Sequence, residues 1–137
     1  MNKKKHTYSK AWHVVYAVQP PIRKVLQACG MGNSRKPYML GKLNAKKYSL
    51  EDFEKHMSSI GFEHVKLAWC EDGEVLSMRR VDGLKFQWHV RVFEDGEVRG
   101  HYEYSAEGNP IHHLRGKVFQ DDKDFLLSLL GDYIVRS

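Results

Sequence analysis

Acidic residues are absent from the first fifty positions of this chain, in which Glu51 is the first carboxylate. The same stretch carries eleven of the 22 Lys and Arg residues. The other eleven basic residues share positions 51–137 with all 17 acids, so the net charge of +5 divides into +11 and −6. An acid-free segment of this length calls for a physical cause.

Cysteine is also scarce, because Cys29 and Cys70 are the only two and no CxxC pair exists. This excludes a disulfide scaffold and favours a reducing compartment, for which we expect the cytoplasm. No run of about 18 apolar residues occurs, so we expect no membrane-spanning helix and no membrane association. A Walker loop and the GxGxxG, GxSxG and HExxH motifs are missing too, and on this ground we lean away from an enzyme.

The sharpest explanation of the charge asymmetry is a surface that binds RNA or DNA. Aromatic residues are interleaved with the basic ones, and bases stack on such rings while Lys and Arg hold phosphates. Self-neutralisation by the acidic remainder of the chain, or docking onto an acidic protein partner, explains the same asymmetry. The expected phosphate contacts are Lys3, Lys4, Lys5, Lys10, Arg23, Lys24, Arg35, Lys36, Lys42, Lys46 and Lys47, and the expected stacking residues are Trp12, Tyr38 and Tyr48.

The chain divides into a basic segment over residues 1–48 and a core over residues 49–137, which we expect to form one domain. In the first segment, composition predicts a strand over 12–18, a short helix over 22–29 and a basic loop over 30–47. The core opens with a helix over 49–60, because Ser49 is a good N-cap and acids follow it in the first turn. A second apolar stripe predicts a closing helix over 121–134.

Three Asp-Gly pairs, at 72–73, 82–83 and 95–96, lie between runs rich in β-branched and aromatic residues. Asp-Gly in this setting marks hairpin turns. We therefore predict an α+β fold: a four-stranded antiparallel β-meander over 62–70, 74–80, 84–93 and 97–105, with helices packed on one face and the basic segment preceding it.

Hairpin register decides which side chains meet. A three-residue turn over 94–96 makes one face of the last hairpin uniformly apolar, whereas a two-residue turn mixes apolar and charged residues. The favoured register pairs Val92 with Val98 and Trp88 with Tyr102. By the same reasoning, a turn over 81–83 sets Met78 opposite Phe86 and Leu76 opposite Trp88.

The opposite face, which we expect to be solvated, carries pairs of like groups. Arg91 falls across from Arg99, and an anion lying over both would relieve their repulsion, which adds them to the expected phosphate contacts. His89 falls across from His101, with Glu103 two positions along the same strand. Two imidazoles and a carboxylate are a ligand set for Fe, Mn or Zn, and His112 and His113 follow in a loop that is able to fold back.

The leading prediction is a small nucleic-acid-binding protein without a cofactor. The alternative is a metal-dependent or His-assisted enzyme, nuclease-like, that uses His89, His101 and Glu103 with a divalent metal. A protein-interaction subunit that docks an acidic partner is the second alternative.

Overall fold

The fold was analysed in a computed structural model, which describes residues 38–65, 71–114, 118–119 and 123–136, together with positions 21–22, 24–25 and 28. The last five positions are helical, and four of them fall within the helix expected over 22–29. The expected strand over 12–18 lies outside the described residues. Among the helices described, none has the length and apolar character needed to cross a bilayer.

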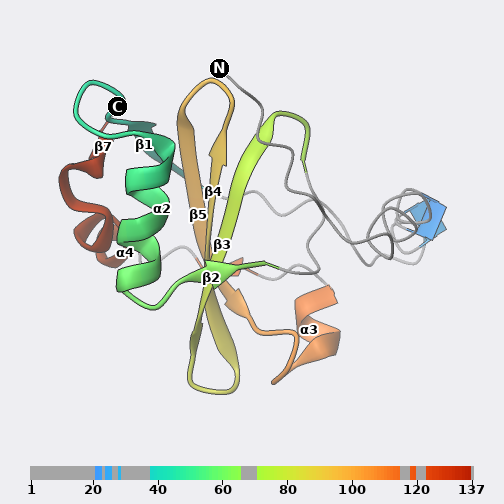
Figure 1. The fold of residues 1–137 in the computed structure, drawn as a ribbon. Coiled ribbons are helices and arrows are strands. Elements are labelled where there is room, and N and C mark those ends of the chain that lie inside the picture. Colours follow the sequence, from blue (N-terminus) through green and yellow to red (C-terminus); the bar gives the residue numbers. More distant parts are fainter. Residues whose placement is uncertain are drawn as a thin grey trace.

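One antiparallel sheet dominates the fold (Figure 1). Its strands follow the order β2-β3-β4-β5-β1-β7, and β6 also pairs with β5. The sheet therefore contains more strands than the four that were predicted. The strands are β1 (Tyr38–Leu43), β2 (Glu63–His64), β3 (Glu74–Asp82), β4 (Phe86–Phe93), β5 (Glu97–Tyr104), β6 (Val118–Phe119) and β7 (Ile134–Val135).

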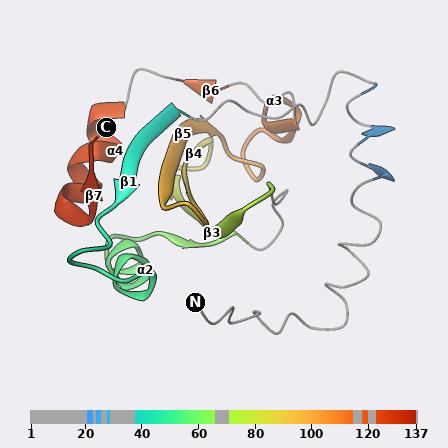
Figure 2. The ribbon, with the colours of Figure 1, turned by 90° about the horizontal axis from the view of Figure 1, so that it is seen from above.

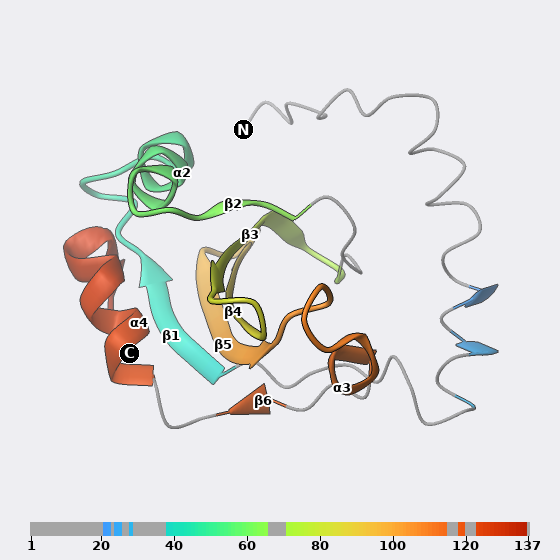
Figure 3. The same ribbon diagram turned by 90° about the horizontal axis from the view of Figure 1, so that it is seen from below.

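Besides the helical positions between 21 and 28, three α-helices accompany the sheet in the described part of the chain: α2 (Leu50–Ser59), α3 (Pro110–Leu114) and α4 (Lys123–Leu130). In Figure 2, α2 and α4 lie toward one side of the strands and α3 toward the other. Figure 3 shows the same separation from below. Apolar side chains of α2 and α4 share one core with the sheet, formed by residues that include Phe53, Met57, Val90, Val98, Leu126 and Leu130.

The start of α2 confirms the expected cap. The Ser49 hydroxyl accepts a hydrogen bond from the Asp52 amide at 3.1 Å, while the Asp52 carboxylate accepts one from the Ser49 amide at 2.8 Å. This reciprocal capping box satisfies two amides that a helix start otherwise leaves without partners.

Strand β1 corrects the prediction of a loop over 30–47. Gly41 and Lys42 read locally as loop residues, but Tyr38–Leu43 pairs with β5 on one side and β7 on the other. Gly41 is needed there, because a Cβ atom at this position would lie 2.4 Å from the carbonyl oxygen of Val135. The glycine that suggests a loop thus permits the close approach of β7.

The closing helix is also shorter than expected. It ends at Leu130, and a 3-10 turn over Gly131–Tyr133 leads into β7. Gly131 has a φ of 54°, a left-handed conformation that terminates helices. Ile134, assigned to the helix by its apolar spacing, is instead a buried strand residue paired with Leu43.

The strand pairing of two hairpins can be compared with the registers predicted from the sequence. The β4–β5 register is confirmed, with Val92 opposite Val98 and Trp88 opposite Tyr102. The β3–β4 register was wrong, because Met78 lies opposite Val90 rather than Phe86. Strand β3 extends to Asp82, so the turn occupies the next three positions. The register differs from the predicted one by an even number of residues, so each side chain remains on its predicted face of the sheet.

A candidate metal centre on the buried polar face

Side chains alternate between two environments along β4 and β5. Val90, Val92 and Val98 point into the apolar core, and the intervening residues point to the opposite side, here called the polar face. The prediction that this face is solvated was wrong. Its residues Gln87, His89, Arg91, His101 and Glu103 are all buried, each with at most 6% of its surface exposed.

The two histidines form one rung of the β4–β5 ladder. His89 and His101 are directly opposite each other, and their ring centroids are 5.1 Å apart in an edge-to-face arrangement. Nε2 of His89 is hydrogen-bonded to Oγ of Ser77 on β3, at 2.7 Å. Neither ring nitrogen of His101 makes a hydrogen bond with the described part of the chain, although its side chain is only 1% exposed.

Glu103 brings a carboxylate to the same point. Its Oε1 accepts a hydrogen bond from Nε2 of Gln87 at 2.7 Å, which fixes the carboxylate on the neighbouring rung. The same oxygen lies 3.3 Å from Nε2 of His101 and 3.8 Å from Nδ1 of His89. We call His89, His101 and Glu103 the His–Glu cluster.

The His–Glu cluster has the dimensions of a metal site. One donor atom from each residue lies within 4.8 Å of the other two. Ligands held at about 2.1 Å around a tetrahedral metal are about 3.4 Å apart, close to the two distances from Oε1 of Glu103 to the imidazoles. Ser77 accepts from Nε2 of His89 in this arrangement, which leaves Nδ1 as the donor atom; metal-binding histidines usually make such a second hydrogen bond.

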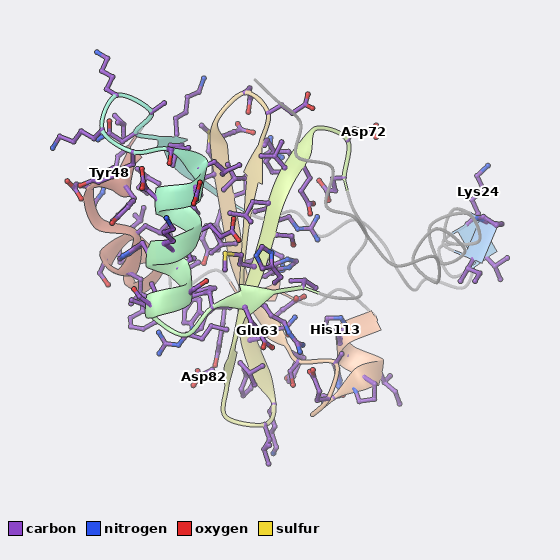
Figure 4. The ribbon with its side chains drawn as sticks, in the orientation of Figure 1. Lys24, Tyr48, Glu63, Asp72, Asp82 and His113 are labelled. Carbon is purple, nitrogen blue, oxygen red and sulfur yellow. The ribbon has the colours of Figure 1, made fainter. Side chains whose placement is uncertain are left out.

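A third histidine reaches the edge of the cluster from α3. Nδ1 of His113 lies 4.0 Å from Oε2 of Glu103 and donates a hydrogen bond to the carbonyl oxygen of Tyr104 at 2.8 Å. Figure 4 labels His113 on the side of the sheet away from Tyr48. His112 behaves differently: its Nδ1 bonds Oδ1 of Asn109, and its ring packs against Tyr104. Of the two adjacent histidines, only His113 approaches the cluster.

No protein-family model matches this chain, and neither does any curated protein or solved structure. The site is therefore interpreted from its own geometry.

Hydrogen bonds extend from Glu103 to the surface. Gln87 accepts from Nη1 of Arg79 at 3.2 Å, and Arg79 in turn forms ion pairs with Glu107 and Glu63. The hydrogen bond with Arg79 lowers the pKa of the Glu107 carboxyl, and the same contact raises the pKa of the guanidinium. This chain of contacts positions the Gln87 amide against Glu103.

The arginine pair on the next rung is neutralised by acids. Nη1 of Arg91 lies 3.2 Å from a carboxylate oxygen of Glu71 and 3.2 Å from one of Glu74, while Arg99 donates to Glu97 at 2.8 Å. Arg91 and Arg99 are opposite each other as predicted, but no anion is needed to offset their repulsion. The positive charge of each guanidinium is therefore already compensated by carboxylates in the described structure.

Sequence reasoning missed both acids that pair with Arg91. A bulge between Glu74 and Leu76 turns Glu74 toward the polar face, where burial raises the pKa of its carboxyl. The repeated EDGEV letters at 71–75 were a signal, because the copy at 94–98 also places an acid, Glu97, beside an arginine.

The residues expected to bind nucleic acid are partly described. Lys24, Lys42 and Lys46 are exposed, whereas Lys47 forms an ion pair with Asp132 at 3.5 Å. Tyr48 is stacked on Tyr133 and donates its hydroxyl to Asp132. Tyr38 is half-buried against the core. The remaining candidates, Lys3, Lys4, Lys5, Lys10, Trp12, Arg23, Arg35 and Lys36, lie outside the described residues.

Proposed function

We propose that this protein binds one divalent transition-metal ion through His89, His101 and Glu103 and acts as a metal-dependent enzyme. One observation carries the proposal: two imidazoles and a carboxylate, all buried, bring donor atoms within 4.8 Å of one another. Nitrogen and oxygen donors of this kind suit Zn, Fe or Mn.

Burial argues against a cluster without a cation. A carboxylate that loses its water needs compensating charge or hydrogen bonds. The neutral Gln87 amide donates one such hydrogen bond to Oε1 of Glu103. Within the described residues, neither ring nitrogen of His101 has a hydrogen-bond partner. A metal ion bound by one of these nitrogens and by the Glu103 carboxylate would compensate for the unfavourable burial of both groups.

Three protein ligands leave a coordination position open. Structural zinc sites are usually closed by four protein ligands, whereas catalytic sites keep a position for water or substrate. A metal in such a site polarises a bound carbonyl or phosphoryl oxygen and lowers the pKa of bound water. The His–Glu cluster therefore suits metal-assisted hydrolysis or addition more than a purely structural role.

Metal analysis of the purified protein tests the proposal. We expect about one equivalent of metal after exposure to Zn²⁺ or Mn²⁺ and dialysis, with an increase in melting temperature that a chelator reverses. His101→Ala should abolish both effects. His64→Ala is the matched control, because His64 also lies 2.7 Å from a carboxylate, Glu54, but on the exposed surface. A wild-type protein that binds neither metal, or a His101→Ala variant that binds as well as wild type, would reject the metal centre.

Nucleic-acid binding is a second candidate, favoured by the acid-free stretch with its eleven positive charges. The exposed Lys42 and Lys46 extend that basic character into the described structure, at the end of β1 and in the turn after it. Binding of RNA or DNA at near-physiological salt is the measurement, and absence of binding at micromolar protein would reject it. The two functions are compatible, since a metal-dependent nuclease would use both a metal ion and a basic surface.

A further inference from the structure

Arg91 has a buried donor that is not used by any group in the described part of the chain. The residue is 6% exposed, and its Nη1 is shared between Glu71 and Glu74. Its Nε is buried and makes no hydrogen bond within the described chain. A buried guanidinium N–H without an acceptor is costly, so an acceptor at this point would stabilise the folded protein.

This donor stands next to the His–Glu cluster. Arg91 follows His89 by two positions on β4 and shares its face, which separates their attachment points by about 7 Å. An oxyanion can span such a gap. One oxygen would bond the metal at about 2.1 Å, and a second oxygen of the same group would accept from the guanidinium at about 2.9 Å.

Charge favours an anion at the open position. A divalent ion with one carboxylate and two neutral imidazoles carries a net charge of +1, and the residues around it are buried. Isolated charge is unfavourable in such surroundings, so an anionic fourth ligand would be preferred over a neutral one. Arg91 adds a donor without adding uncompensated positive charge, because Glu71 and Glu74 already neutralise it.

We infer that the open position takes an oxyanion, either a phosphate or a carboxylate group of the substrate, shared between the metal ion and Nε of Arg91. The inference rests on the proposed metal centre. It assigns Arg91 a role in binding anionic substrate through a donor that its ion pairs leave available.

Arg99 differs from Arg91 both in its exposure and in the use of its Nε. It is the cross-strand neighbour of Arg91, but its side chain is 37% exposed. Its Nε and Nη2 both donate to Glu97, and the guanidinium also lies 5.0 Å from the ring centre of Phe93. Its Nε is therefore already used, and Arg99 serves as the matched control.

The experiment uses full-length protein loaded with Co²⁺, whose visible absorption reports its ligands. Co²⁺ affinity is measured first for wild type, Arg91→Lys and Arg99→Lys. Each Co²⁺ protein is then titrated with inorganic phosphate and, separately, with acetate. Lysine keeps the positive charge beside Glu71 and Glu74 but lacks the Nε–H donor, so Arg91→Lys leaves the ion pairs possible while removing the proposed contact.

We expect saturable spectral changes in wild type, and the anion that binds more tightly identifies the oxyanion class. Arg91→Lys should weaken anion binding about tenfold to a hundredfold, as expected for loss of a charge-assisted hydrogen bond. Its Co²⁺ affinity, and both affinities of Arg99→Lys, should stay close to wild type. Co²⁺ binding without any anion response, or equal weakening by both substitutions, would reject the anion site and leave the metal centre standing.

Failure of wild type to bind Co²⁺ at all would instead reject the metal centre and the inference with it. If Arg91→Lys does not fold, a measurement on wild type replaces it. The ¹H–¹⁵N resonance of the Arg91 side chain, observed with diamagnetic Zn²⁺, should shift on addition of the preferred anion. An unchanged Arg91 resonance, with anion binding detected at the metal, would contradict the shared site.

Discussion

The two faces of the β4–β5 hairpin are equally buried but are stabilised in different ways. On one face, Val90, Val92 and Val98 lie in the apolar core, where burial itself is favourable. On the other, His89, His101 and Glu103 are as inaccessible, yet burial of these groups is unfavourable unless each finds a partner. Burial therefore stabilises the first face directly, whereas the second face needs partners for its buried groups, which the proposed metal ion would supply.

The largest expected effect tests the apolar face. Trp88 is buried, with its ring 4.3 Å from that of Tyr102 and 5.0 Å from that of Phe125. Trp88→Ala should lower the free energy of unfolding by about 3–5 kcal/mol, measured by urea denaturation. Leu84→Ala is the control, because Leu84 in the adjacent turn is 83% exposed and its truncation should cost little. Similar losses in both variants would mean that Trp88 does not belong to the core.

The next effect tests the polar face. At a metal concentration about one hundred times Kd, binding should stabilise wild type by about 2.7 kcal/mol. Glu103→Gln keeps the shape of the side chain but removes its charge, so this metal-dependent gain should nearly vanish in thermal denaturation. Glu54→Gln, which alters the half-buried carboxylate beside His64, should retain the metal-dependent gain. Full metal stabilisation of Glu103→Gln would exclude this carboxylate as a ligand.

A smaller effect separates the exposed lysines from an arginine that is already paired with an acid. If the protein binds nucleic acid, Lys42→Gln and Lys46→Gln should each flatten the slope of log K against log salt, by about 0.7 for single strands or 0.9 for B-DNA. Arg99→Gln should leave the slope unchanged, because Glu97 already pairs with Arg99. Flattening by Arg99→Gln alone would place the polar face, rather than the exposed lysines, in the nucleic-acid contact.

The smallest effect concerns the rim of the polar face. The Arg79 contact lowers the pKa of Glu107 below its usual value of 4.5, so the stabilisation is present above that pH. It is lost as pH falls through the lowered pKa. Because Glu107 is exposed, Glu107→Gln should cost about 0.5 kcal/mol at pH 7, a difference that disappears in acid. A difference that persists below the lowered pKa would mean that this ion pair is not its origin.

Local signals in the sequence predicted the helix start at Ser49 and the register of β4 and β5, including the His89–His101 pair. They failed where distant segments decide the outcome. Tyr38–Leu43 becomes a strand only because β5 and β7 lie on either side of it. Alternation along β4 separated apolar from polar residues, but alternation does not tell a solvated face from a covered one. The sequence therefore identified the side chains of the candidate site, but it did not predict that they are buried.

Strand β5 also determines when the sheet is completed during folding, because three other strands pair with it. It pairs with β4 through a short turn, and its other edge is shared by β1 and β6. The β4–β5 hairpin therefore forms at low entropic cost, whereas β1 must close a long loop to reach Gly100. During synthesis, β1 leaves the ribosome well before its partner exists. Strand β1 thus cannot join the sheet until β5 has been made, and the sheet is completed late.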